Sequence, residues 1–391
     1  MSVKILLIHN EYQQPVGEDQ VFAAEANLLE DHGHEILRYS VHNDQIARMN
    51  PVSLAGTTVW SRSSYRELKA LVRREQPDIA HFHNTFPLIS PAGYYAAKAG
   101  NVPVVQTLHN YRLICPNALF FRDGHVCEDC LGKTPPWPGV LHACYRGSRQ
   151  ASGAVAAMLT AHRLLRTWTR MVDVYIALNE FARGKFVQGG LPAEKIIVKP
   201  NTYPDPGQHE TVRNNALFVG RLSVEKGIDV LLEAWERLGD RMKLTIVGEG
   251  PMADVVAERT RRLENVEWLG RRPKEEVLEL MKRAGMLVFP SVWYEGFPMT
   301  IVEAYGVGLP IVASNLGSLA TLVEPGRTGL LFRPNDPGDL AAKVRWALDH
   351  PNELDNMRRG ARKEFEAKYT AEQNYGRLLG VYRVASERAG S

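Results

Sequence analysis

The sequence predicts an α/β protein built from two Rossmann-like, doubly wound domains. Short apolar runs alternate along the chain with stretches of helical length and period, as in parallel sheets covered by helices on both faces. The alternation occurs in two successive sets, which a proline-rich segment separates. With 391 residues, the chain is long enough for two domains of about 100–200 residues each.

The apolar runs are the predicted strands of two sheets. The first set comprises Lys4–His9, Glu35–Val41, Ile79–His83, Pro103–His109, Val174–Leu178 and Ile196–Pro200. The second set comprises Ala216–Gly220, Lys243–Val247, Val266–Gly270, Met286–Pro290 and Pro310–Ser314. Stretches between the runs, such as Gln20–Gly33 and Gly227–Leu238, have the length and period of helices.

The segment Pro200–Gly207 marks the domain boundary, because its three prolines and one glycine cannot continue a helix or a central strand. We therefore expect a first domain over residues 1–201 and a second over residues 202–371. The last predicted helix, in residues 372–391, is expected to cross back to the first domain. Residues 111–149 break the alternation and are rich in proline, glycine, cysteine and aromatic residues, so we interpret them as an insertion in the first domain.

Composition and charge exclude several protein classes. Hydrophobic residues make up 45% and charged residues 23%, and the net charge of +3 is far from the clustered basic excess of a nucleic-acid binder. Four cysteines in a chain of this length do not indicate a disulfide-stapled secreted domain. No run of about 18 apolar residues predicts a membrane span, and Met1–His9 is too short and too soon polar for a signal peptide. We expect a cytoplasmic protein.

The most informative motif follows the predicted strand that ends at Pro290. A short loop carries Glu295 and Gly296, and a helical run begins near Met299. Free backbone amides at a helix start attract anions, and a glycine allows the backbone to approach a ligand closely, so a diphosphate would fit. Glu303, one turn into the helix, can accept hydrogen bonds from ribose hydroxyls. The alternative is a solvated loop with a helix-capping glutamate.

A second motif, Arg221–Gly227, also follows a predicted strand and opens a helix. Arg221 and Lys226 leave the carboxyl end of the strand, where ligands bind in open α/β sheets. Two cations there can neutralise a diphosphate leaving group. The alternative is a pair of surface cations without a ligand.

Together the two motifs resemble glycosyltransferase family 4, a retaining group with the glycosyltransferase-B fold, in which two Rossmann-like domains face each other across a cleft. The family signature Glu-x7-Glu is matched by Glu295 and Glu303, and its phosphate-binding pair by Arg221 and Lys226. The resemblance spans nearly the whole chain. One departure is Gly317–Thr321 (Gly-Ser-Leu-Ala-Thr), where family members often carry Gly-Gly-x-x-Glu.

The resemblance implies a retaining transferase of the hexosyltransferase type that uses a nucleotide-diphosphate sugar and no catalytic metal. The cations and helix-terminal amides would stabilise the departing diphosphate, while an acceptor hydroxyl attacks from the same face of the sugar. The implied catalytic residues are His109, Arg221, Lys226 and Glu295. The implied donor-binding residues are Gly17, Arg221, Lys226, Glu295, Gly296, Phe297, Pro298 and Glu303.

The first-domain residues carry weaker signals. Val16–Gln20 stands where the family has a glycine-rich loop facing the donor, and Gly17 is its one glycine here. Glu18 and Asp19 either bind acceptor hydroxyls or cap the following helix. By resemblance His109, at a strand end, contacts a hydroxyl of the transferred sugar; the alternative is a structural histidine bonded to a neighbouring loop.

All four cysteines lie within the predicted insertion, in the spacing C-x11-C-x2-C-x13-C. A C-x2-C pair with a cysteine on each side resembles a four-thiolate zinc site, which would order the loop and leave no open position for catalysis. Free thiols and a redox pair are the alternatives, and His125 and His142 are possible substitute ligands. The predicted zinc ligands are Cys115, Cys127, Cys130 and Cys144.

The expected partners are a nucleotide-diphosphate sugar and a sugar or lipid-linked sugar acceptor, in polysaccharide or glycoconjugate biosynthesis. Arginines in Ala154–Arg170 could touch the inner face of an anionic membrane, although an ordinary surface helix is the alternative. Two other functions stay open: another enzyme on the same fold, such as a sugar-nucleotide epimerase or a phosphorylase, and a non-catalytic, zinc-stabilised sugar-nucleotide-binding module.

Overall fold

The computed structural model describes residues 2–14, 17–208 and 215–390, so Val16 of the first-domain motif lies outside the described residues. The chain forms two compact units. Unit 1 comprises residues 1–120, 128–201 and 374–391, and unit 2 comprises residues 121–127 and 202–373. The main division falls after Asn201, inside the proline-rich segment, and most of the last helix belongs to unit 1.

Unit 1 contains a parallel sheet of six strands among the described residues, in the order β2-β1-β3-β4-β7-β8. The strands are β1 (Lys4–Glu11), β2 (Glu35–His42), β3 (Ile79–Asn84), β4 (Val104–Leu108), β7 (Val174–Ala177) and β8 (Ile196–Val198). The strand order reverses beside β1, and ligands bind at such switch points outside the carboxyl ends of the strands.

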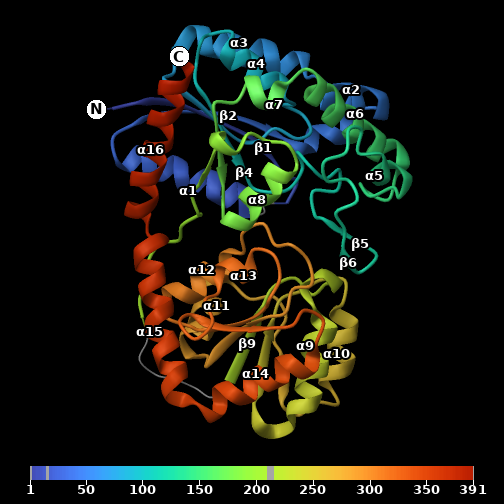
Figure 1. The fold of residues 1–391 in the computed structure, drawn as a ribbon, viewed down its shortest axis with the longest axis vertical. Coiled ribbons are helices and arrows are strands. Elements are labelled where there is room, and N and C mark those ends of the chain that lie inside the picture. Colours follow the sequence, from blue (N-terminus) through green and yellow to red (C-terminus); the bar gives the residue numbers. More distant parts are fainter. Residues whose placement is uncertain (1, 15–16, 209–214, 391) are drawn as a thin grey trace. The chain divides into compact units, whose positions relative to one another are not determined.

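Helices cover this sheet, and the segment between β4 and α6 is mostly irregular (Figure 1). The helices of this unit are α1 (Gly17–Asp31), α2 (Pro51–Val59), α3 (Arg62–Glu75), α4 (Ala92–Lys98), α5 (Trp137–Leu141), α6 (Arg149–Leu164), α7 (Thr167–Arg170), α8 (Glu180–Gln188) and most of α16 (Ala371–Ala389). A short hairpin of two two-residue strands, β5 (Phe121–Arg122) and β6 (His125–Val126), lies within the irregular segment.

The last helix, α16, completes the core of unit 1. Leu378 and Val381 are buried in one cluster with Ile5 and Leu7 of β1. The same helix supplies Asn374, which is 1% exposed. A segment far from β1 in the sequence therefore packs its apolar face on the sheet.

Unit 2 contains a second parallel sheet, with six strands among the described residues in the order β11-β10-β9-β12-β13-β14. The strands are β9 (Asn215–Val219), β10 (Lys243–Val247), β11 (Val266–Trp268), β12 (Met286–Phe289), β13 (Ile311–Ser314) and β14 (Gly329–Phe332). The helices are α9 (Ile228–Leu238), α10 (Ala253–Thr260), α11 (Lys274–Arg283), α12 (Met299–Gly306), α13 (Leu319–Leu322), α14 (Pro337–Asp349) and α15 (Pro351–Lys368).

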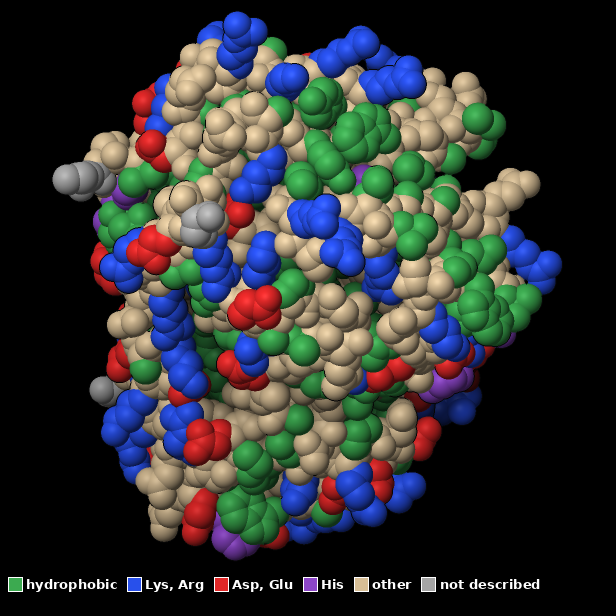
Figure 2. Space-filling model, turned by 45° about the horizontal axis from the view of Figure 1, so that its top comes forward, with side chains coloured by type: hydrophobic (Ala, Val, Ile, Leu, Met, Phe, Trp, Pro, Cys, Tyr) green, Lys and Arg blue, Asp and Glu red, His purple; other side chains and the backbone are tan. Residues whose placement is uncertain are grey.

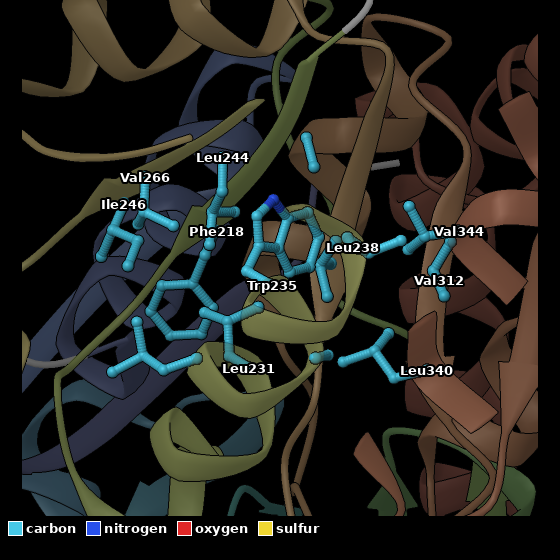
Figure 3. Packing of buried hydrophobic residues seen from close by; sticks show 14 of the residues in the cluster. Phe218, Leu231, Trp235, Leu238, Leu244, Ile246, Val266, Val312, Leu340 and Val344 are labelled. Atoms are coloured by element: carbon cyan, nitrogen blue, oxygen red, sulfur yellow. The ribbon is translucent and has the colours of Figure 1, made fainter. Parts of the chain in front are cut away.

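One of two buried clusters in the described part of unit 2 contains Trp235 of α9, whose side chain is fully buried. Figure 3 shows its indole between Phe218 and Leu238. The indole Nε1 donates to the carbonyl of Met242 at 3.0 Å, so the buried polar atom is satisfied. Helix α9 thereby holds the sheet beside the loop that carries Lys226.

The two sheets confirm the prediction of two Rossmann-like domains. The prediction missed β14, which pairs with β13 at the sheet edge. None of the helices in the described part of the chain combines the length and apolar character needed to cross a membrane. Figure 2 shows basic and acidic side chains interspersed over the visible face, in keeping with the small net charge.

Candidate functional site

The two second-domain motifs lie at the switch point of the sheet in unit 2. Strands β9 and β12 are neighbours, while β10 and β13 continue the sheet in opposite directions. Arg221–Gly227 follows β9, and the loop with Glu295 follows β12. The fold thus brings together, at the carboxyl ends of two central strands, two segments that are about 70 residues apart in the sequence.

Glu295 is the centre of this arrangement and is 5% exposed. Its Oε1 atom lies 2.7 Å from Nζ of Lys226 and accepts hydrogen bonds from Ser291 Oγ at 2.6 Å and Trp293 Nε1 at 2.8 Å. These donors hold the carboxylate in one orientation, and the carboxylate in turn holds the Lys226 ammonium at the strand end.

The backbone also locks the two loops together. Gly227 has φ of +71°, and a Cβ at this position would lie 2.0 Å from the carbonyl oxygen of Pro290. Beside it, Val292 N–H donates to the carbonyl of Glu225 at 2.9 Å. Only glycine fits here, because both the positive φ and the close approach exclude a side chain.

Helix α12 begins at Met299, directly after this loop, and places Glu303 in its interior. Burial raises the pKa of Glu303, and the ammonium of Lys274, 3.6 Å away, partly offsets this shift. Lys274 also lies 4.5 Å from the ring centroid of Tyr203. Neither Lys274 nor Tyr203 belongs to a motif, so the sequence gives no sign of their place beside Glu303.

The other residues that the sequence predicts to bind the donor differ in their burial. Arg221 is exposed at the end of β9, and Gly296 is half-buried in the loop. Pro298 is buried at the N-cap of α12, and the Phe297 ring packs against the core, 6.2 Å from the Tyr369 ring. The Phe297 side chain thus anchors the loop to the core of unit 2.

Two further contacts of this region were not foreseen. The Ser318 hydroxyl donates to the carbonyl of Glu295 at 2.8 Å, so the departure from the family's Gly-Gly pattern supports the glutamate loop. After β10, Gly248 and Gly250 pack against the Arg221 loop; a Cβ on Gly250 would lie 2.4 Å from the carbonyl oxygen of Leu222. The Gly-x-Gly spacing after a strand was the available signal.

In unit 1 the candidate His109 stands with two other histidines, His83 and His9, near the carboxyl ends of neighbouring strands. Nε2 of His109 lies 3.0 Å from Nδ1 of His83, and Nε2 of His9 lies 2.8 Å from Asp19 Oδ1. Burial lowers the pKa of His83 and of His109 well below the usual value, so both rings are neutral near pH 7. His109 is half-buried, whereas His83 is 2% exposed.

Gly17 begins α1 and is exposed, with open space where a Cβ would project. The next residue, Glu18, accepts hydrogen bonds from Asn110 Nδ2 at 2.7 Å and from Tyr12 at 3.1 Å. Burial raises the pKa of Glu18 to about 7. A carboxyl group with that pKa, next to the His109 segment, is suited to exchanging hydrogen bonds with hydroxyls.

The cysteine segment folds around Gly139. A Cβ on this glycine would lie 2.8 Å from Pro116 and 3.4 Å from Sγ of Cys130, and its carbonyl accepts from Cys144 N–H at 2.9 Å. Cys115, next to Pro116, and Cys130 are buried, whereas Cys127 and Cys144 are half-buried. Gly139 thus brings the chain near Cys115, Cys130 and Cys144 into one neighbourhood.

Two family models match the chain. The model described as Glycosyltransferase Family 4 matches residues 20–204, and the model described as Glycosyl transferases group 1 matches residues 201–364. Glycogen synthase of Mycobacterium tuberculosis is 36% identical over 76% of this chain, which spans 66% of that relative's length. D-inositol 3-phosphate glycosyltransferase 1 of Catenulispora acidiphila is 28% identical, covering 79% of this chain and 73% of its own.

Solved structures are similar over nearly the whole chain. The structure of Anabaena HepE in complex with UDP has a TM-score of 0.69 at 18% identity and covers 97% of this chain and 99% of its own. Sucrose-phosphate synthase of Thermosynechococcus elongatus has a TM-score of 0.69 at 16% identity, and the match covers 97% of this chain and 98% of that protein. At these identities the likeness concerns the fold.

We predict that Gly227→Ala destabilises unit 2 by about 3 kcal/mol, because the new methyl group meets the Pro290 carbonyl and the positive φ is strained. The matched control is Gly326→Ala, where φ is +79° but nothing lies within 4 Å of the Cβ position. The control substitution should lower the free energy of unfolding by only about 1–2 kcal/mol. Urea unfolding measures the stability of both variants. Equal losses of stability would show that the close contact between Gly227 and Pro290 does not hold the two loops together.

Proposed function

Because the chain belongs to the glycosyltransferases whose family models match its two halves, we propose that it transfers a sugar from a nucleotide-diphosphate donor to an acceptor hydroxyl with retention of configuration. The observation that carries this proposal is the Lys226–Glu295 pair at the switch point of unit 2. The names of the similar proteins support it, since one of them, HepE, was solved with UDP-glucose.

The donor diphosphate would lie against Arg221, Lys226 and the first amides of α12. Negative charge develops on the diphosphate as the bond to the sugar breaks, and fixed cations stabilise that charge without reorganising. Glu295 keeps Lys226 in place before the donor binds. Arg221 is exposed and adds a second positive charge. These two cations supply the charge that a divalent metal supplies in other transferases.

Glu303 is the proposed contact of the nucleoside. Its carboxylate lies on α12 behind the loop, and each of its oxygens can accept a hydrogen bond from a ribose hydroxyl. On the acceptor side, we propose that His109 contacts a hydroxyl of the transferred sugar. The sugar then ionises towards an oxocarbenium-like state, and the acceptor hydroxyl attacks from the face that the diphosphate leaves, passing its proton to the leaving phosphate.

For the acceptor we propose a lipid-linked sugar. Unit 1 has a largely apolar cavity of about 580 Å³ between α2 and α6, lined by Leu54, Phe86 and Val155 and bordered by Arg146. An apolar chain fits this lining, and the Arg146 guanidinium is placed to contact a linking phosphate. Val52 on its rim is 83% exposed. Such an acceptor would bring the chain to the cytoplasmic face of a membrane as a peripheral protein.

We further propose that the four cysteines bind one structural zinc ion. Thiolates are its preferred ligands in closed tetrahedral sites. The packing around Gly139 supports the proposal, because it gathers three of the four cysteine segments, and only two residues separate Cys127 from Cys130. The ion would order a segment in which regular structure is scarce, rather than act on the substrate.

The transfer proposal is tested with Lys226→Ala and a panel of sugar nucleotides, UDP-glucose first. Release of nucleoside diphosphate should fall about 10²–10³-fold in kcat/KM, as when one donor to a developing oxyanion is removed. Lys243→Ala is the control, since Lys243 is exposed at the opposite, amino end of the β10 strand. Full activity in a folded Lys226→Ala protein would refute the site, and no turnover by the wild type would favour a binding module.

The acceptor proposal predicts that Ala154→Trp, which fills the apolar cavity, raises KM for an acceptor with a long polyprenyl chain and leaves KM for a short-chain analogue unchanged. Ala157→Trp is the control, because Ala157 lies on the exposed side of the same helix. If both variants affect both acceptors equally, the cavity does not hold the lipid.

The zinc proposal predicts about one zinc per chain by elemental analysis of the purified protein. Cys130→Ser should lose the ion and lower the melting temperature, whereas His125→Ala, at an exposed hairpin position, should keep it. A folded, metal-free wild type whose thiols all react with a thiol reagent would contradict the proposal.

A further inference from the structure

A buried ion pair lies beside the histidines of unit 1. Nζ of Lys199 lies 2.5 Å from Oε1 of Glu25 and 3.3 Å from Oδ1 of Asn374. Lys199 follows β8, Glu25 belongs to α1 and Asn374 to α16, and all are at most 3% exposed. An ion pair this deeply buried is costly unless its geometry is good, so its presence calls for a role beyond stability.

The other carboxylate oxygen of Glu25 points to the histidines. Among the described residues, Glu25 Oε2 and His83 Nε2 are buried without a hydrogen-bond partner, and these two atoms are 3.5 Å apart. On the far side of the ring, His83 Nδ1 lies 3.0 Å from His109 Nε2. A chain of contacts therefore runs from Lys199 through Glu25 and His83 to His109, in which the Glu25–His83 step is an approach of 3.5 Å.

Hydrogen counting fixes the direction of this chain. A carboxylate paired with an ammonium carries no proton and only accepts, so a hydrogen bond that forms between Glu25 and His83 takes its hydrogen from His83 Nε2. The His83 ring is neutral because burial lowers its pKa, and it therefore presents a lone pair at Nδ1. His109 must then donate through Nε2–H, and its own neutral ring carries a lone pair at Nδ1.

We propose that Glu25, held by Lys199, is a positioning residue that acts through His83 to fix His109 in its Nε2–H form, so that Nδ1 of His109 accepts a hydrogen bond from a hydroxyl of the transferred sugar. The tautomer part of this proposal stands on unit 1 alone; the sugar contact rests on the proposed function. The chain explains both buried atoms that otherwise have no partner, and it assigns His109 the role of acceptor rather than donor.

A metal ion is the alternative reading of this cluster, since Glu25, His81 and His83 offer ligand atoms within 4.8 Å of one another. The Lys199 ammonium, however, already supplies a positive charge to Glu25. Both ring nitrogens of His81 are also engaged, Nδ1 with Tyr382 at 2.9 Å and Nε2 with Thr107 at 2.8 Å. The geometry favours a proton-ordered chain over a cation site.

The test reads the tautomers directly, by long-range proton–nitrogen correlation spectra of the full chain labelled with ¹⁵N-histidine. We expect the Nε2–H form for both His83 and His109 in the wild-type protein without substrate. In Glu25→Gln the amide can still accept from Lys199 while its NH₂ donates to His83 Nε2. Both rings should then shift to the Nδ1–H form, which turns His109 from an acceptor into a donor.

Tyr382→Phe is the matched control, because it removes a hydrogen bond to His81 in the same cluster and leaves the chain to His109 intact. It should keep the tautomers and the donor kinetics, whereas Glu25→Gln should lower kcat/KM for the donor about tenfold or more. An Nδ1–H form of His109 in the wild type would overturn the proposal, whether or not Glu25→Gln folds. If both histidines show the expected tautomers but the protein turns over no sugar nucleotide, the proposed function is refuted and the tautomer assignment stands.

Discussion

The contact between Lys226 and Glu295 is the interaction on which the proposed donor site depends. It joins the loop after β9 to the loop after β12, the two strands that flank the switch point. Ser291 and Trp293 bond the same carboxylate oxygen, and Gly227 lets the two backbones touch. The ammonium is therefore in position before a ligand arrives, which is the condition for electrostatic stabilisation at low reorganisation cost.

Unit 1 uses a related device for a different purpose. There a buried lysine–glutamate pair, Lys199 and Glu25, lies behind the histidines instead of facing the ligand. Its charge orders the protons of neutral rings rather than stabilising a leaving group. Asn374 of α16 completes the pair, so the C-terminal helix contributes both to the core of unit 1 and to its histidine chain.

The sequence was sufficient for the fold class, nearly all strands of the two sheets and the strand-loop-helix setting of the two second-domain motifs, because each depends on local pattern. It was not sufficient for Lys274, Ser318 or the Glu25–His83 contact. These residues are brought to their partners by tertiary packing between segments far apart in the chain. The edge strand β14 was also missed, although the shorter edge strands β8 and β11 were predicted.

The central claim, a retaining transfer at the Lys226–Glu295 site, is tested most directly by the stereochemistry of the first product. The sugar nucleotide that the chain turns over would be followed by proton NMR during slow hydrolysis, before the released sugar mutarotates. We predict that the first-formed sugar has the same anomeric configuration as the donor. The opposite anomer as the first product would contradict the account.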